Sequence, residues 1–429
     1  MSKVRVYLLA ILLFGLMLKS VQADVVPGDI INASNYQQIQ GLVPDYVFDW
    51  VKKGDLSMKI GKLNCDPKEF LPQVVKDNWQ SNIGKYKIDD NNGIVDAKTG
   101  KPVRDIKGLP FPEPDPKDPK MAVMLMWNQK FQEYFIKGPT LNTLNWFSIS
   151  RKGLEKNMLL ESYMLPADPN SDYDFIELSV FKSPMSIAGT GTLVHYCLDP
   201  TKEGIRFIYT PELRKIRRMS HRMAGSDTIL GMDSAPDDFW AGGERDALNM
   251  SDYRFIEEKE ALVPYVTADP EKLVRTADGA LQGGFSVSGR KIIMGYEDKN
   301  WKGAPWHFTN IIWVKSKVYV IESKDKSPNY NYGPCQGWVE KGTFLPSYKR
   351  ITDLNGKFWK GNYYCGVPFQ SQDGKFRIIY KYGNVMVDIR RDHGSAYPDI
   401  FREGGSCIYE KQNINKSMFT RAGFEKFTK

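Results

Sequence analysis

Apolar and polar residues alternate with a period of two from about residue 140 to residue 392. This period is typical of β-strands, because successive side chains of a strand point to opposite faces of a sheet. Turn-forming residues separate the alternating stretches. We therefore predict strands in the following ranges: 142–150, 156–165, 190–198, 203–219, 254–265, 290–298, 306–324, 337–354, 356–366, 374–383 and 384–392.

The connections between these strands indicate how they pair. Asn355-Gly356 and Asp373-Gly374 are dipeptides typical of tight hairpins. Little helical periodicity separates the strands, whereas parallel pairing would need crossover helices. A sheet this long must curl or close on itself. The fold class is therefore mainly β (α+β), with a large curved antiparallel sheet or unclosed β-barrel and N-terminal helices packed on it.

The segment before the sheet favours short helices. Residues 45–54, DYVFDWVKKG, place Tyr46, Val47, Trp50 and Val51 on one face and end in glycine, so we predict a helix capped by Gly54. A second helix is predicted over residues 67–79, with a kink or break at its internal proline, since proline disrupts a helix interior.

Prolines and turn formers dominate residues 83–120, which predicts an extended surface segment. Asp118-Pro119 then forms a helix start, with aspartate as N-cap and proline in the first turn. Apolar residues recur at helical spacing after it, and they are Met121, Met124, Leu125, Phe131, Tyr134 and Phe135. We expect this helix to pack against the sheet.

Residues 1–23 read as a secretory signal peptide. Lys3 and Arg5 precede an apolar run that ends near Leu18, and Val21-x-Ala23 resembles a cleavage site. The run is shorter than the roughly 20 residues of a membrane-spanning helix. The mature chain is therefore expected in the periplasm. Its formal charge falls from +8 to +5 when these residues are removed, and this mild basicity fits an anionic lipid or partner surface better than nucleic acid.

The chain is large enough for a substantial core, with 41% hydrophobic and 13% aromatic residues among 429. Its cysteines lack CxxC spacing, which argues against zinc. In an oxidising compartment one or two disulfides are expected, with pairing among the last three cysteines. The five cysteines are Cys65, Cys197, Cys335, Cys365 and Cys407.

No catalytic signature is present in the sequence. The four histidines lie far apart, no HExxH occurs, and the lone glycine pair at Gly189 and Gly191 lacks the lysine of a phosphate-binding loop. We therefore expect no enzyme activity, no cofactor and no metal site.

Residues 214–222, RKIRRMSHR, form a cationic block that is followed at once by an acidic one. The acidic residues are Asp227, Asp233, Asp237 and Asp238, near His221. They could bind a hard cation or act as acid and base, but their spacing matches no known metal loop, and mutual neutralisation across a loop is the simpler interpretation. The cationic block is either a solvated strand end or a rim that binds an anionic headgroup.

The aromatic residues have two interpretations as well. They either fill the core between helices and sheet, or line a hollow, since curled sheets of about eight strands already hold small ligands. The candidate ligand-binding residues are Phe207, Tyr209, Arg214, Arg217, Arg218, Arg222, Trp240, Trp306, Phe308 and Trp313.

Several blocks resemble the DUF1329 family, which is grouped with the LolA/LolB-like fold of lipoprotein sorting. They are residues 27–55, 108–128, 214–243, 258–265 and 418–427. The resemblance implies an unclosed antiparallel barrel with helices at its opening and an apolar hollow inside. It divides the chain into the signal peptide 1–23, an N-terminal helical and Pro-rich segment 24–140, and a LolA/LolB-like β domain 141–429. The family brings no catalytic residues.

These observations predict a periplasmic carrier or binding protein for a lipid or other hydrophobic molecule, acting near the outer membrane. Burial of each methylene of such a molecule is worth about 0.8 kcal/mol, so it needs shelter from water. Two alternatives stay open. One is an envelope hydrolase that uses the carboxylates of the Asp227–Asp238 loop. The other is a factor that binds an outer-membrane protein partner.

Overall fold

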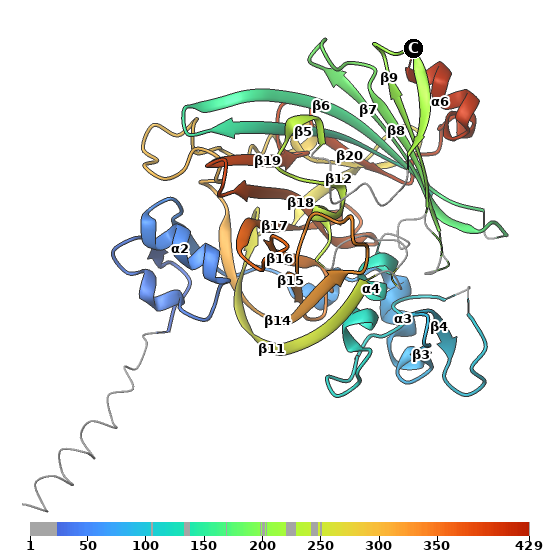
Figure 1. Cartoon of the computed structure of the whole chain (residues 1–429), viewed down its shortest axis with the longest axis horizontal. Helices are drawn as coiled ribbons and strands as arrows, with labels where there is room; N and C mark the ends of the chain where they lie inside the picture. Colours follow the sequence, from blue (N-terminus) through green and yellow to red (C-terminus); the bar gives the residue numbers. More distant parts are fainter. Residues whose placement is uncertain are drawn as a thin grey trace, which may run out of the picture.

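The computed structural model describes residues 24–428, apart from 104–105, 133–137, 169, 198, 200–201, 203, 220–228, 242–247 and 249–250. The predicted signal peptide lies outside this range. Strands dominate the chain and form an 18-stranded sheet with a separate two-stranded one (Figure 1). This confirms the mainly β fold class. No helix in the described ranges combines the length and the apolar character that crossing a membrane requires.

The strands are β1 (Ile30–Ile31), β2 (Met58–Gly61), β3 (Tyr86–Ile88), β4 (Ile94–Asp96), β5 (Thr140–Ser150), β6 (Gly153–Pro166), β7 (Tyr173–Ser183), β8 (Gly191–Cys197), β9 (Ile205–Thr210), β10 (Lys215–Met219), β11 (Ser251–Tyr265), β12 (Glu271–Arg275), β13 (Leu281–Gly283), β14 (Ile312–Asp325), β15 (Cys335–Glu340), β16 (Pro346–Thr352), β17 (Phe358–Ser371), β18 (Arg377–Asp388), β19 (His393–Asp399) and β20 (Ser406–Tyr409). The helices are α2 (Asp45–Lys53), α3 (Gln73–Asn82), α4 (Met121–Gln132), α5 (Phe285–Ser288) and α6 (Arg421–Thr428). Short 3-10 turns are η1 (Tyr36–Ile39), η2 (Pro67–Phe70), η5 (Ile229–Gly231), η6 (Pro236–Phe239) and η8 (Lys416–Phe419).

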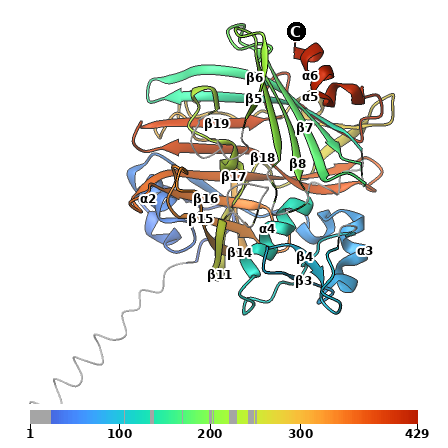
Figure 2. The ribbon, with the colours of Figure 1, turned by 45° about the vertical axis from the view of Figure 1, so that its right-hand side comes forward.

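Antiparallel pairing links most of the sheet in one series. It runs from β10 through β9, β8, β7, β6 and β5 to β19, and on through β18, β17, β16, β15 and β14 to β11. Asn355-Gly356 and Asp373-Gly374 join β16 to β17 and β17 to β18, with both glycines at positive φ, which confirms the predicted hairpins. Strands β5 to β9 spread as a fan beside the stacked strands β14 to β19 (Figure 2). We call β5–β9 the fan.

The sheet differs from a simple antiparallel meander in three places. β2 pairs in parallel with β14, and β11 and β12 pair in parallel with the second half of β17. The two strands of each parallel pair are far apart in the sequence and are not joined by a hairpin. Residues 290–298, predicted as a strand, form a loop with one isolated bridge from Met294 to Phe308. The predicted ranges do not include β7, β12, β13, β19 or β20.

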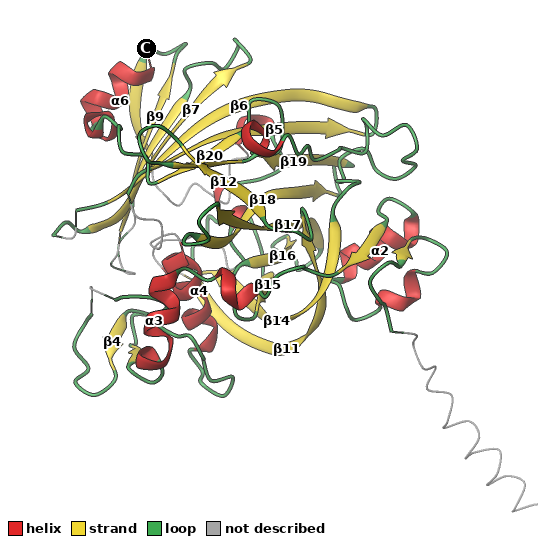
Figure 3. Ribbon diagram, turned by 180° about the vertical axis from the view of Figure 1, so that it is seen from behind, coloured by secondary structure: helices red, strands yellow, loops and turns green. Residues whose placement is uncertain are grey.

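The N-terminal helices follow the sequence pattern. Tyr46, Val47, Trp50 and Val51 of α2 are buried, and Gly54 caps the helix at φ 78°, as predicted. The second predicted helix is interrupted at its proline, where η2 ends and α3 begins. α3 and the β3–β4 hairpin lie below the sheet in Figure 3, next to α4.

Helix α4 is buried on every side, not along one stripe. It begins at Met121, three residues after the predicted Asp118 cap, whose carboxylate accepts a hydrogen bond from the backbone N–H of Lys120 at 2.7 Å. It packs with β11, β14 and β15 in a cluster that includes Tyr319, Ile321 and Val339. The predicted positions 134 and 135 lie outside the described residues.

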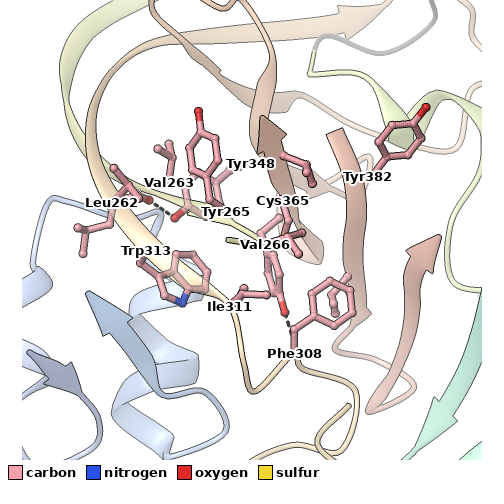
Figure 4. Close-up of a cluster of buried hydrophobic side chains, with 14 of the residues drawn as sticks. Leu262, Val263, Tyr265, Val266, Phe308, Ile311, Trp313, Tyr348, Cys365 and Tyr382 are labelled. Carbon is pink, nitrogen blue, oxygen red and sulfur yellow. Dashed lines mark hydrogen bonds between the residues drawn. The ribbon is translucent and has the colours of Figure 1, made fainter. Parts of the chain in front are cut away.

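The main core lies between α2 and the strands β14 to β18. Figure 4 shows part of it, where the Tyr348 hydroxyl donates to the carbonyl of Leu262 and the N–H of Phe308 donates to the Tyr363 hydroxyl. Buried polar atoms inside a core must find partners, and these two hydrogen bonds meet that requirement.

All five cysteines are free thiols. The predicted pairing among Cys335, Cys365 and Cys407 is therefore wrong. Cys335 belongs to a small cluster with Tyr332 and Ile351, whereas the other two lie in the main core. The buried core, and not covalent links, holds these strands together.

Candidate functional site

The inner face of the fan borders a cavity of about 290 Å³, which we call the hollow. Strand alternation explains its walls, because residues two apart on one strand share a face. The fan contributes Asn142, Leu144 and Trp146 of β5, Leu160, Ser162 and Met164 of β6, Glu177, Ser179 and Phe181 of β7, Thr192, Val194 and Tyr196 of β8, and Arg206 of β9. Tyr380, Lys381 and Tyr382 of β18 and Asp399 of β19 complete the wall opposite.

The strand register places these side chains in rows that run across neighbouring strands, and we call each row a rank. Leu144 lies opposite Leu160, which neighbours Phe181 on β7, so one rank is apolar. The adjacent rank is polar along its whole length and consists of Asn142, Ser162, Ser179 and Thr192. The hollow therefore has an apolar part and a polar part, which suits an amphipathic molecule.

A third rank carries charge. Glu177 accepts hydrogen bonds from Ser162 Oγ at 3.2 Å, Ser179 Oγ at 3.0 Å and the Tyr196 hydroxyl at 3.0 Å. Arg206 lies two strands away, opposite Val194, which is itself opposite Glu177. The Nε of Arg206 is buried without a hydrogen-bond partner among the described residues. The guanidinium is thus a candidate contact for an anionic or polar group in the hollow.

Residues 229–241, which we call the plug segment, cross the inner face of the sheet and carry most of the acidic block. The Asp233 side chain is fully buried there. Its carboxylate accepts from Arg391 Nη1 at 2.8 Å and Ser395 Oγ at 2.8 Å, and lies 2.6 Å from His393 Nδ1. His393 and Ser395 are alternate residues at the start of β19, and Arg391 lies in the turn before it, so this end of β19 holds Asp233.

Two buried lysines hold the rest of the plug segment. Lys349 Nζ donates to the carbonyl of Asp237 at 2.6 Å and lies 3.6 Å from a carboxylate oxygen of Asp238. Lys360 Nζ donates to the carbonyl of Asp233 at 2.6 Å. Buried charges are stable only when they are paired and hydrogen-bonded. Asp238 of the acidic block thus pairs with the charge of Lys349, whereas Lys360 binds the backbone of the block.

These contacts occupy the carboxylates that the sequence offered as a metal site or an acid–base pair. Asp237 and Asp238 also accept hydrogen bonds from the hydroxyls of Tyr330 and Tyr332, and all of the described carboxylates of the block are enclosed by the sheet. No group of His, Cys, Asp or Glu side chains in the described ranges is placed to hold a metal ion. Asp227 and His221 lie outside those ranges.

One arrangement near Asp233 has the composition of a hydrolytic triad. Ser148 Oγ lies 3.3 Å from His393 Nε2, on the side of the ring opposite Asp233. Burial opposes protonation of His393, but the hydrogen bond and charge of Asp233 outweigh it and raise its pKa. Ser148 and His393 are 2% and 4% exposed, and neither lines the hollow. The arrangement therefore anchors the plug segment.

The plug segment ends at the hollow. Phe239 and Trp240 line it, and the Phe239 ring packs against Tyr397 at 5.2 Å between centroids and against Trp146 at 6.1 Å. Of the predicted ligand-binding residues, Trp240 is the one that the structure places on this cavity.

The other predicted aromatic residues lie elsewhere. Tyr209 is buried, and both it and Phe207 face away from the hollow, in a cluster under α6 that includes Phe424. Trp306, Phe308 and Trp313 lie in the main core, with exposures of 2%, 1% and 1%.

The predicted basic residues lie along the end of the fan. Arg214 occupies the turn between β9 and β10, and Arg217 and Arg218 are exposed on β10. Arg217 pairs with Ile208, two residues from Arg206, so it shares the face that borders the hollow. Arg222 lies outside the described residues.

Four charged residues of the hollow were not predicted from the sequence: Arg206, Glu177, Lys381 and Asp399. The sequence pattern could have indicated Lys381, since it is a lone charge in the interior of the apolar strand 377–388. The others depend on register between distant strands, which periodicity alone does not supply.

Comparisons with known proteins give one family match and several distant structural similarities. No curated protein matches the sequence. Among solved structures, a putative outer membrane lipoprotein-sorting protein domain from Vibrio parahaemolyticus is similar at 12% identity and a TM-score of 0.44, covering 67% of this chain and 92% of that one. A DUF1329 family protein from Desulfovibrio piger is similar at 13% identity and 0.44, covering 70% and 98%. A LolA superfamily protein from Nitrosomonas europaea is similar at 10% identity and 0.39, with the same coverage.

The strongest match is at the level of the family. The family model described as "Protein of unknown function (DUF1329)" matches residues 30–424, which include the fan, the plug segment and α4. Since this match spans most of the sequence, the chain belongs to the DUF1329 family.

Proposed function

We propose that this protein binds a lipid or other hydrophobic molecule in the hollow and carries it through the periplasm near the outer membrane. The observation that carries the proposal is the cavity of about 290 Å³ between the fan and β18. The hollow is a partly open cleft with mainly apolar walls and a few polar side chains, which is the usual composition of a site for a small molecule. It therefore favours an exchangeable occupant over a purely structural sheet.

The layered lining supports an amphipathic cargo. An alkyl chain against Leu144, Leu160 and Phe181 would gain about 0.8 kcal/mol for each buried methylene. Polar groups of the cargo would meet the rank that contains Ser162 and Ser179. A carrier must release its cargo as well as bind it. Burial of only several methylenes gives a moderate affinity, which allows release.

Co-purification tests the proposal. The mature chain is purified without detergent, extracted with organic solvent, and the extract is analysed by mass spectrometry. We expect a lipid at a ratio approaching one per chain. Leu160→Trp places a larger side chain in the hollow and should reduce the bound lipid at least five-fold. Leu154→Trp is the matched control, because Leu154 lies on the same strand and is 42% exposed.

An extract without lipid, together with failure of the chain to bind a hydrophobic fluorophore, would contradict the carrier function. Equal loss of lipid in both tryptophan variants would show that the hollow is not the binding site. Far-UV circular dichroism of both variants checks that each has folded.

A further inference from the structure

A second, smaller cavity of about 140 Å³ adjoins the hollow, and we call it the inner chamber. Gln129 and Gln132 of α4 line it, together with Leu345, Pro346, Tyr364, Gly383 and Asn384. The two cavities have further lining residues in common, which are Phe239, Trp240, Tyr380, Lys381 and Asp399. The two cavities therefore border each other at these five side chains.

Polar atoms without partners gather in the inner chamber. Lys381 Nζ, both amide atoms of Gln129, Nε2 of Gln132 and Oδ1 of Asn384 are shielded from solvent, and none has a hydrogen-bond partner among the described residues. Leaving such a group unsatisfied costs about 1–3 kcal/mol. Native proteins rarely accept that cost several times in one place. The inner chamber is therefore suited to a polar occupant.

Lys381, whose Nζ is shielded from solvent, differs from three lysines that are buried as whole residues. Lys130 forms an ion pair with Asp174 at 3.1 Å, and Lys349 and Lys360 bind the plug segment. The ammonium of Lys381 lies 5.3 Å from the centroid of the Tyr265 ring and has no hydrogen-bond partner in the part of the chain that the structure describes. Burial lowers the pKa of Lys381, which an anion beside it would reverse.

The charge of Glu340 raises the pKa of Lys381 and so opposes the effect of burial, but its carboxylate is not hydrogen-bonded to the ammonium. Glu340 accepts hydrogen bonds from Tyr265 at 2.7 Å, Ser316 at 2.9 Å and Thr343 at 3.1 Å. Burial raises the pKa of Asp399 to about 8, so this carboxyl is mainly protonated at neutral pH. Among the described residues that line the inner chamber, Lys381 is thus a basic group without a hydrogen-bonded counterion.

We propose that the inner chamber binds the carboxylate of a long-chain carboxylic acid, whose alkyl chain lies in the hollow. The inference rests on the proposed function and names the class of cargo. A carboxylate matches the single charge of Lys381, and its oxygens accept from the ammonium and from the side-chain amides of Gln129 and Gln132. At ~30 Å³ per water, the chamber has room for about four or five waters, which suits a carboxylate better than a glycerophosphate headgroup.

The two glutamines are well placed for this role. They lie three residues apart on α4, and residues at this spacing share one face of a helix. Because α4 is buried on every side, its glutamines are held in position by packing.

The experiment compares three ligands with one alkyl chain: hexadecanoate, hexadecan-1-ol and hexadecyl phosphate. The delipidated mature chain is titrated with each by displacement of a hydrophobic fluorophore. We expect hexadecanoate to bind at least ten-fold more tightly than the alcohol and more tightly than the phosphate. Lys381→Met should remove this preference by weakening the acid about ten-fold, with the affinity for the alcohol unchanged. Lys302→Met, at an exposed position, should behave as the wild type.

The outcomes separate the two proposals. Equal binding of acid and alcohol, unchanged by Lys381→Met, would overturn the carboxylate site and leave the carrier function standing. Tighter binding of the phosphate than of the acid would also overturn it. Failure of every ligand to bind would overturn the carrier function itself. If Lys381→Met does not fold, Gln129→Leu is the second variant, and an unchanged affinity for hexadecanoate in that variant would contradict the proposal.

Discussion

Asp399 shows how burial alters a single residue of the hollow. Its carboxyl accepts a hydrogen bond from Trp146 Nε1 at 3.1 Å, yet burial raises its pKa to about 8. Its backbone is left-handed, with φ 45°, a conformation that asparagine also tolerates. Asp399→Asn is therefore a variant that keeps the shape and the acceptor oxygen but cannot ionise.

We expect the folded state to lose stability as pH rises from about 4 to about 8. An unfolded aspartate releases its proton near pH 4, whereas folded Asp399 keeps it until about pH 8, so unfolding releases a proton in this window. The slope contributed by this residue is at most about 1.4 kcal/mol per pH unit. Thermal unfolding across this range should show a smaller decline in Asp399→Asn. Parallel curves for the two proteins would show that the carboxyl ionises normally.

Individual charges were the hardest features to predict. Lys349 and Lys360 lie in strands where apolar and polar residues alternate, and this periodicity alone would place both side chains in solvent, whereas both are buried. Their burial depends on Asp233, Asp237 and Asp238, more than 100 residues away in the chain. The sequence predicted mutual neutralisation of the acidic block, but it pointed to the adjacent arginines and not to these lysines.

The plug segment is the element on which the shape of the hollow depends. It covers the inner face over β16 and β17 and at the start of β19. Its residues Ile229, Met232 and Phe239 also pack on part of the fan, and the rest of the inner face of the fan borders the hollow. Strand periods and hairpin turns could be read from the sequence because they are local. The position of this segment could not, because it depends on which faces of three distant strands carry its partners.

Removal of the Asp233 side chain should therefore destabilise the protein strongly. Asp233→Ala leaves His393 and Arg391 without their buried partner, and loss of one member of a buried ion pair typically costs 3–5 kcal/mol. Urea unfolding measures the change. Asp252→Ala is the control, because that side chain is 75% exposed and its loss should change the free energy of unfolding by about 0.5 kcal/mol or less. Similar midpoints for the two variants would show that the plug segment does not depend on this contact.

The whole molecule is a mixed sheet whose strands are joined largely by local hairpins. The period-two pattern predicted this fold class correctly, since each strand needs only its own alternation. It did not predict the parallel pairs of β2, β11 and β12, which join segments with no turn between them. Stability without disulfides follows from the extent of the buried core.

Thiol labelling tests this description of the molecule. Cys65 is partly exposed and the other four cysteines are buried. We expect at most one thiol to react with a disulfide reagent in the native state, and all five in denaturant. Labelling of Cys65 should be slow, because burial and nearby aspartates raise its pKa to about 11. Cys65→Ser should abolish the native reaction, and a reductant should leave the melting temperature unchanged. A melting temperature lowered by the reductant would reveal a disulfide.

Strand β10, which lies beside the last strand of the fan, has a consequence for solubility. Among the described strands, β10 pairs with β9 alone, so one side of its backbone is open to a strand from another molecule. Lys215, Arg217 and Arg218 are exposed along this border. Charged side chains on such borders discourage edge-to-edge aggregation, because two copies would bring like charges together. Whatever else these cations contact, they help to keep a sheet of this size monodisperse.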